Sequence, residues 1–217
     1  MIKINKKAGF WIRLLATIID LIIFLAVLIA TSFLAFNYKT GKFYNLLNYY
    51  LWLSIAISSL LIIWLFIPML WNGKTVGMAI CKIKVIAKDP KTSIVKAIFD
   101  RQRLFAFIWF FVFIAFAILV SPQTFEQAAL INKKTQPLNK VQKLFLLLPT
   151  ILASIAAFVE TFFILSNAKI SKIGLNDKFS QTYTVWINKF EEVEEPDLND
   201  NSIVPVYRKL PIIKYEN

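Results

Sequence analysis

Long apolar runs, rather than a regular alternation of apolar and polar positions, dominate the pattern of this chain. A transmembrane helix needs about 20 mostly apolar residues to cross about 30 Å of hydrocarbon. Four stretches fit this requirement, at residues 10–36, 46–70, 104–120 and 144–165. We therefore predict an all-α, polytopic transmembrane helix bundle with four spans, within a domain that covers residues 1–188.

The first of these runs has an alternative interpretation as a cleaved signal peptide, because Lys3, Lys6 and Lys7 precede it. Its apolar run is longer than the core of a signal peptide, and Asp20 interrupts it. These two features favour a span that stays in the mature protein.

Residues 71–103, between the second and third runs, are long for a connection in a helix bundle. Residues 80–86 alternate apolar side chains with lysines, as in a strand or an amphipathic segment. Beyond a turn at Asp89-Pro90, an amphipathic helix capped by Thr92 or Ser93 is expected to lie on lipid headgroups. This loop is predicted to be cytoplasmic.

Residues 189–217 differ in composition from the rest of the chain. They include Glu191, Glu192, Glu194, Glu195, Asp197 and Asp200. Runs of like charge are typical of solvated, disordered tails, so we expect an acidic and largely disordered cytoplasmic tail. An acidic tail that binds a partner is the alternative.

The composition agrees with a membrane protein and excludes several kinds of chemistry. Hydrophobic residues make up 58% of the chain and charged residues 18%, against about 45–50% and 25% in soluble domains. The chain has no His and one Cys, which excludes His-based zinc, haem and Ser-His-Asp sites and an intrachain disulfide. We expect no metal site, no cofactor and no enzymatic activity.

The formal net charge is +12, and the distribution of the cations along the chain indicates the orientation in the membrane. The N-terminal segment, residues 71–103 and the segment after the fourth run carry fifteen Lys and Arg, against six in the other two connections. The positive-inside rule then predicts a multi-pass protein of the cell membrane with both termini in the cytoplasm.

The loop cations explain the surplus charge without nucleic acid, because each gains about 1 kcal/mol near anionic lipid. The residues expected to contact lipid headgroups are Lys82, Lys84, Lys96, Arg101 and Arg103.

Three charged residues, Arg13, Asp20 and Glu160, fall inside the predicted spans. A charge at a helix centre costs about 2.5–3.5 kcal/mol on insertion scales, so such residues usually pair or face water. Asp20 and Glu160 are expected at similar depths in the cytoplasmic half, where they could flank a cation or proton. Alternatively, Asp20 pairs with Arg101 or Arg103 and fixes helix packing, and Glu160 snorkels or stays protonated.

Residues 73–75, Gly-Lys-Thr, look like the end of a phosphate-binding loop. That motif requires another glycine at position 68, which is Pro68, so we do not expect a nucleotide site.

Three stretches together resemble the RDD family of bacterial membrane proteins, named for an arginine and two aspartates. They are residues 9–20, residues 73–86 followed by Arg101, and residues 174–179. Arg13 and Asp20 occupy the places of the R and the first D, and Asp177 that of the second. One departure is Asn176, where relatives often have His.

The resemblance covers about residues 8–188 and implies a role for Asp177. Because Asp177 and Arg13 both lie near the predicted cytoplasmic interface, the resemblance makes Asp177 a candidate partner of Arg13. The family is mostly uncharacterised, and some members are linked to cation/proton antiport.

These observations favour a transporter-like or transport-associated membrane protein that exchanges a monovalent cation for protons. Asp20 would carry the ion or proton, and Glu160 would assist it. Arg13 would set the pKa of the Asp20 carboxyl group. The alternative is a non-enzymatic membrane scaffold or assembly factor whose basic loop binds anionic lipid or a partner protein. Four spans are few for a transport path, so we expect a homodimer.

Overall fold

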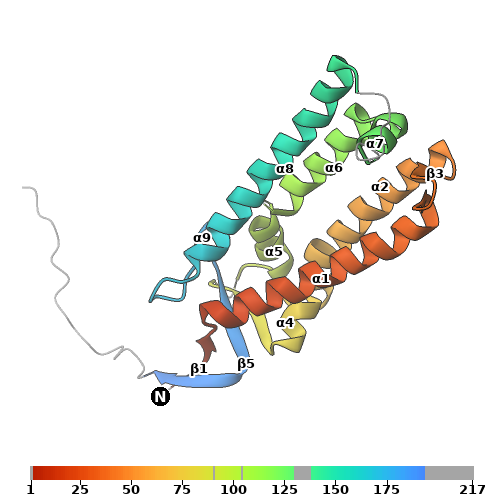
Figure 1. Ribbon diagram of the computed structural model, residues 1–217. Coiled ribbons are helices and arrows are strands. Elements are labelled where there is room, and N and C mark those ends of the chain that lie inside the picture. Colours follow the sequence, from red (N-terminus) through yellow and green to blue (C-terminus); the bar gives the residue numbers. More distant parts are fainter. Residues whose placement is uncertain (1, 90, 104, 130–137, 194–217) are drawn as a thin grey trace, which may run out of the picture.

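The computed structural model describes residues 2–89, 91–103, 105–129 and 138–193. Long helices run back and forth between two ends of the molecule (Figure 1). They are α1 (Phe10–Ala35), α2 (Leu46–Leu61) with its continuations η1 (Ile62–Phe66) and α3 (Ile67–Leu70), α6 (Phe105–Leu119) and α8 (Lys140–Ser166). Helix α1 packs against α2, α2 against α6, and α6 against α8. In Figure 1, the α1/α2 pair diverges from the α6/α8 pair.

Shorter elements close the two ends of the bundle. At one end are the hairpin strands β2 (Phe36–Asn37) and β3 (Lys42–Phe43) and the helix α7 (Pro122–Ala129). At the other end are β1 (Ile2–Lys7), α4 (Val76–Ile80), β4 (Ile83–Ala87), α5 (Ile94–Gln102), α9 (Leu175–Phe179) and β5 (Thr182–Val193).

Three of the four predicted spans are confirmed as helices long and apolar enough to cross a membrane: Phe10–Ala35, Leu46–Leu70 and Lys140–Ser166. The predicted span at residues 104–120 corresponds to α6, which reaches the required length only together with α5, across a bend of 51°. Within the described residues, three helices are therefore candidate membrane spans by length and composition, or four when this bent pair counts as one span.

Helix α8 begins at Lys140, four residues before the predicted start, where Asn139 and Gln142 form a capping box. Pro149 consequently lies in the helix interior rather than in its first turn. The wide π-helical turn η1, which continues α2, ends two residues before Pro68. Proline lacks the N–H that would bond the preceding turn, and a local π-helical turn keeps such a helix continuous.

The all-α prediction is wrong, because strands from three distant segments form an antiparallel sheet in the order β1-β5-β4. In register, Lys3 lies opposite Glu192, and Val85 lies opposite Thr184. Ile83 in β4 and Val185 in β5 are both buried, although their side chains point to opposite faces of the sheet, because Val185 lies opposite Lys84, the neighbour of Ile83. Residues 83–86 of the predicted alternation therefore belong to the strand β4, whereas Ile80 is the last residue of α4.

The strand β5 extends into the segment predicted as an acidic tail. Residues 189–193 belong to β5 and pair with β1. Exposed ion pairs join Lys3 to Glu192 (3.9 Å) and Lys6 to Glu191 (3.5 Å); such pairs contribute at most about 1 kcal/mol each. The remainder of the predicted tail, residues 194–217, lies outside the described residues.

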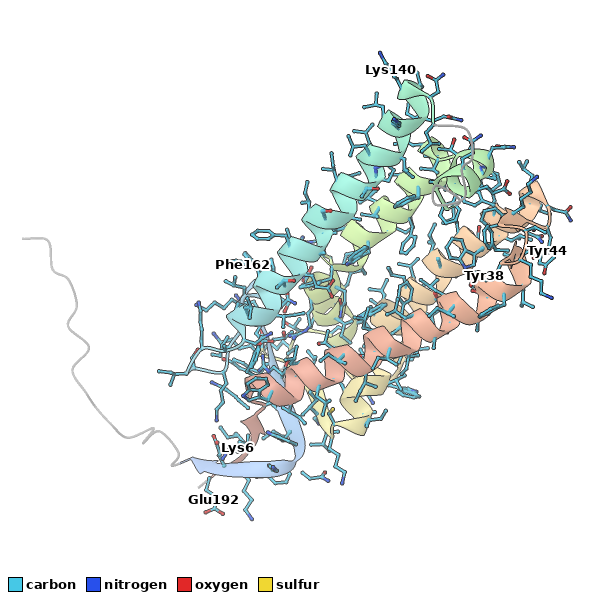
Figure 2. All side chains as sticks on the ribbon, viewed as in Figure 1. Lys6, Tyr38, Tyr44, Lys140, Phe162 and Glu192 are labelled. Atoms are coloured by element: carbon cyan, nitrogen blue, oxygen red, sulfur yellow. The ribbon has the colours of Figure 1, made fainter. Side chains whose placement is uncertain are left out.

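The sheet brings the N-terminal segment, residues 71–103 and the segment after α8 to one end of the bundle, as the charge distribution predicted. Figure 2 shows Lys6 and Glu192 at this end and Tyr38, Tyr44 and Lys140 at the opposite end. Two tyrosines near the ends of α1 and α2 are typical of a membrane interface.

Polarity along α1 is the reverse of that in a soluble helix. Its buried face carries Arg13, Ala16, Asp20 and Phe24, whereas large apolar side chains such as Ile22 are exposed. Phe162 likewise points away from the bundle on α8 (Figure 2). Apolar outer surfaces with charges buried between helices are the arrangement expected in lipid.

The predicted headgroup-lying helix exists as α5 but is part of the protein interior. Ala97, Ile98 and Arg101 are buried, while Val95 and Phe99 on the other side are exposed. On its buried side, the helix packs against α3, β4 and α9.

Gly77 permits the close approach of α4 to α1. A Cβ atom at this position would lie 2.1 Å from the backbone oxygen of Ala16 and 3.0 Å from the carboxyl carbon of Asp20.

Gly77→Ala should therefore lower the free energy of unfolding by about 1–3 kcal/mol, seen as a lower thermal midpoint of the purified protein. Gly9→Ala is the control, since nothing lies within 4 Å of its added Cβ. Equal midpoints for the two variants would contradict this close packing.

Candidate functional site

Arg13 lies at the start of α1 and uses all five of its N–H groups in hydrogen bonds. Its Nε donates to the Ala8 oxygen (3.1 Å). The acceptors of its Nη atoms are Asn167 Oδ1 (3.0 Å), Asp177 Oδ2 (2.5 Å), the Lys172 oxygen (2.8 Å) and the Thr184 oxygen (3.1 Å). One side chain therefore connects α1 to the end of α8, to α9 and to β5.

Asp177 in α9 binds two guanidinium groups. Besides its ion pair with Arg13, its Oδ1 accepts a hydrogen bond from Nη1 of Arg101 in α5. Arg101 also donates to the hydroxyl oxygens of Thr182 (2.9 Å) and Thr184 (3.1 Å) in β5. The structure confirms the hypothesis that Asp177 pairs with Arg13 and adds Arg101 as a third member.

Asp177 is 2% exposed. Burial alone would raise the pKa of its carboxyl group, but the charges and hydrogen bonds of Arg101 and Arg13 outweigh burial and hold that pKa below its ordinary value. The carboxylate is therefore ionised at neutral pH. We call Arg13, Arg101 and Asp177 the charge cluster.

Asp20, seven residues after Arg13, binds the segment that resembles a phosphate loop. Its Oδ2 accepts from the Thr75 hydroxyl (2.6 Å) and its Oδ1 from the Gly77 N–H (2.7 Å). Thr75 in turn caps α4 by accepting from the Met78 N–H (3.2 Å). Asp20 is 2% exposed and fixes α4 against α1, which is a packing role with partners other than Arg101 or Arg103.

Glu160 lies on α8, seven residues before Asn167, which binds Arg13. Its Oε2 accepts a hydrogen bond from Nε1 of Trp109 in α6 (2.9 Å). Seven residues correspond to about 10 Å along a helix. Asp20 on α1 and Glu160 on α8 therefore stand at similar heights above the contact of Arg13 with Asn167.

A cavity of about 320 Å³ brings these charged residues together between α1 and α8. Arg13, Asp20, Arg101 and Glu160 line it, and most of the remaining lining is aliphatic or aromatic. The two carboxylates predicted to flank one site thus do share one cavity.

The predicted lipid contacts divide into two groups. Lys82, Lys96 and Arg103 are exposed and Lys84 is half-buried at the sheet end. Arg101 is buried in the charge cluster instead, because it lies on the same face of α5 as Ala97 and Ile98. No group of three or more His, Cys, Asp or Glu side chains able to hold a metal occurs within the described part of the chain.

Sequence reasoning missed the polar partners of the cluster and the aromatic part of the cavity. Thr182 and Thr184 alternate along β5 toward Arg101, a period of two that could have indicated one polar face of a strand. The position of Arg101 four residues after Ala97 could have indicated a cation on a buried face. Trp109 gives no comparable signal, because it lies within an unbroken apolar run.

A helix bundle with an apolar outer surface and charged groups buried between its helices defines a multi-pass membrane protein. The model of the RDD family matches residues 7–181, and the chain belongs to this family. Uncharacterized protein YckC of Bacillus subtilis (strain 168) is 37% identical over 86 residues, 40% of this chain and 50% of that protein. The chain thus spans about half the length of this relative. No solved structure matches the chain.

Asp177→Asn should lower the free energy of unfolding by about 3–5 kcal/mol at neutral pH, because two buried guanidinium groups lose their counter-charge. The pKa of Asp177 is below its ordinary value of about 3.9. The carboxylate therefore stabilises the fold fully above about pH 4, and this stabilisation is lost as the pH falls through the folded pKa. Thermal midpoints measured against pH should show the gap between wild type and variant narrowing in acid.

Glu192→Gln is the matched control, since this carboxylate is exposed and its loss should change little. Exchanging the charges of Arg13 and Asp177 should not restore stability, because the cation introduced at position 177 would face Arg101. A pH-independent gap, or full recovery on exchange, would contradict the three-membered cluster.

Proposed function

We propose that this protein is a membrane transport protein that exchanges a monovalent cation for protons through the cavity between α1 and α8. The observation that carries this proposal is the presence of carboxylates from two helices, Asp20 and Glu160, in one mostly apolar cavity. Intramembrane acids of this kind mark ion or proton paths in many membrane proteins.

The charge balance of the cavity favours a ligand with one positive charge. With all groups ionised, the two positive charges of Arg13 and Arg101 are balanced against three carboxylates, namely Asp20 and Glu160 in the lining and Asp177 in the charge cluster. One negative charge is left over, and a single proton or monovalent cation neutralises it. Because the proton and the cation would compete for the same carboxylate, binding of one would release the other, which is the basis of exchange.

The hydrogen bonds support different roles for the two acids in this proposal. Both oxygens of Asp20 are used to hold Thr75 and Gly77, so Asp20 positions α4 in this proposal. Among the described residues, Glu160 accepts a hydrogen bond at Oε2, which leaves Oε1 for a ligand. Glu160 is thus the better candidate for the exchanging group, and Arg13, with every donor in use, fixes the architecture.

In this proposal, the sheet end faces the cytoplasm of the cell and the hairpin end faces outward. Lys82, Lys84, Lys96 and Arg103 at the sheet end would meet anionic headgroups. The saturated charge cluster also supports a second candidate, a non-enzymatic scaffold that binds anionic lipid or a partner protein at this end. The protein is not an enzyme in either proposal.

Proteoliposomes that contain the purified protein and a pH-sensitive dye test the exchange. A gradient of a monovalent cation should move protons in the opposite direction, and Glu160→Gln should reduce this movement at least tenfold, because the amide cannot release a proton. Glu192→Gln, on the exposed end of β5, should leave it unchanged. Unaltered movement in Glu160→Gln, or none in the wild type, would contradict the proposal.

Lipid binding at the sheet end is tested by replacing Lys82, Lys84, Lys96 and Arg103 together with Gln. The affinity for anionic lipid should fall at least about tenfold, since each cation contributes about 1 kcal/mol near a charged surface. The matched control replaces four exposed lysines of the other end, Lys39, Lys42, Lys140 and Lys143. Native mass spectrometry of retained lipid measures both variants, and an equal loss in the two would contradict the assignment.

A further inference from the structure

The lining around Glu160 is aromatic to an extent that the exchange of a proton does not require. Phe24 from α1, Trp64 from η1, and Trp109 and Phe113 from α6 all line the cavity. Phe24 meets Trp64 edge to face at a centroid separation of 5.3 Å and Phe113 at 6.2 Å. Four rings from three helices thus share the lining of this cavity with the carboxylate of Glu160.

Several side-chain oxygen atoms of the lining already take part in hydrogen bonds within the protein. Asn167 Oδ1 accepts from Arg13, Thr184 Oγ1 accepts from Arg101, and Thr75 Oγ1 is shared between Asp20 and Met78. A Na⁺ or K⁺ ion stripped of its water needs several oxygen ligands at once. The aromatic part of the cavity supplies carbon instead.

A carboxylate enclosed by aromatic rings suits a different kind of cation. Organic ammonium and phosphonium ions carry a diffuse, weakly hydrated charge, and the faces of aromatic rings attract such charges. The hydrophobic part of such an ion gains free energy by leaving water for an apolar cavity. A volume of about 320 Å³ is within the range of small-molecule sites.

From this geometry we infer that the ligand of the cavity is an amphipathic organic monocation, which binds with its charge at Glu160 and its apolar groups among Phe24, Trp64, Trp109 and Phe113. This inference rests on the proposed function and names the class of cation that is exchanged. The net positive charge of the charge cluster repels a cation from the base of the cavity, which favours a position beside Glu160, about 10 Å away along α8.

Tetraphenylphosphonium and tetraphenylborate are a suitable pair of probes, because they share shape and hydrophobicity and differ in the sign of their charge. Isothermal titration of the purified full chain should show saturable binding of the phosphonium, and binding of the borate at least tenfold weaker. If hydrophobicity alone drove binding, the phosphonium and the borate would bind equally well. Equal affinities for the two ions would overturn the inference.

Two pairs of variants locate the binding. Glu160→Gln keeps an oxygen for the Trp109 N–H and should weaken phosphonium binding at least tenfold, whereas Glu192→Gln should not change it. Trp64→Leu should weaken binding several-fold, whereas Trp11→Leu should not, because Trp11 is 78% exposed on the outside of α1. Binding that survives Glu160→Gln unchanged would also overturn the inference.

The proteoliposome assay separates this inference from the proposed function. If Na⁺ or K⁺ gradients move protons in a Glu160-dependent way and phosphonium does not bind, the inference fails and the exchange stands. If phosphonium binding depends on Glu160 but no cation moves protons, the binding site stands and the exchange fails.

Discussion

Two buried guanidinium groups close to one another would repel, and neither could be tolerated without the carboxylate of Asp177 between them. This single charge connects Arg13 in α1 and Arg101 in α5, and the threonines of β5 complete the coordination. Because Arg13 also holds the end of α8 through Asn167, the first and last long helices meet at this point. The charge cluster thus connects the sheet to the helices on both sides of the cavity.

This arrangement separates the buried charges by task. Arg13, Asp177 and Asp20 have their polar atoms used in bonds between elements, and such saturated groups hold a structure in place. Glu160 differs, since it stands among aromatic side chains with a bond from Trp109 at one oxygen. The saturated charge cluster and the aromatic lining thus leave one carboxylate, Glu160, as the group to which we attribute the proposed exchange.

The sequence predicted those features that depend on local composition. Apolar length determines whether a helix can span a membrane, and the spans at residues 10–36 and 46–70 needed no knowledge of the fold. The sheet was missed because β1 and β5 pair across most of the chain. Arg101 was placed at the lipid surface because charge counting treats every loop cation as exposed, and the partners of Asp20 lie 55 and 57 residues away. Asp177 was predicted as a partner of Arg13 from the family resemblance, because the residues next to it in the sequence give no sign that it is buried or paired.

In the proposed exchange, Glu160, and not Asp20, releases its proton when a cation binds. Infrared difference spectroscopy of the membrane-embedded protein observes this directly, through the carbonyl stretch of a protonated carboxyl group. Adding a monovalent cation should remove such a band in the wild type and in Asp20→Asn, and no band should disappear in Glu160→Gln. A band that is still lost in Glu160→Gln, or that is absent in Asp20→Asn, would contradict the account.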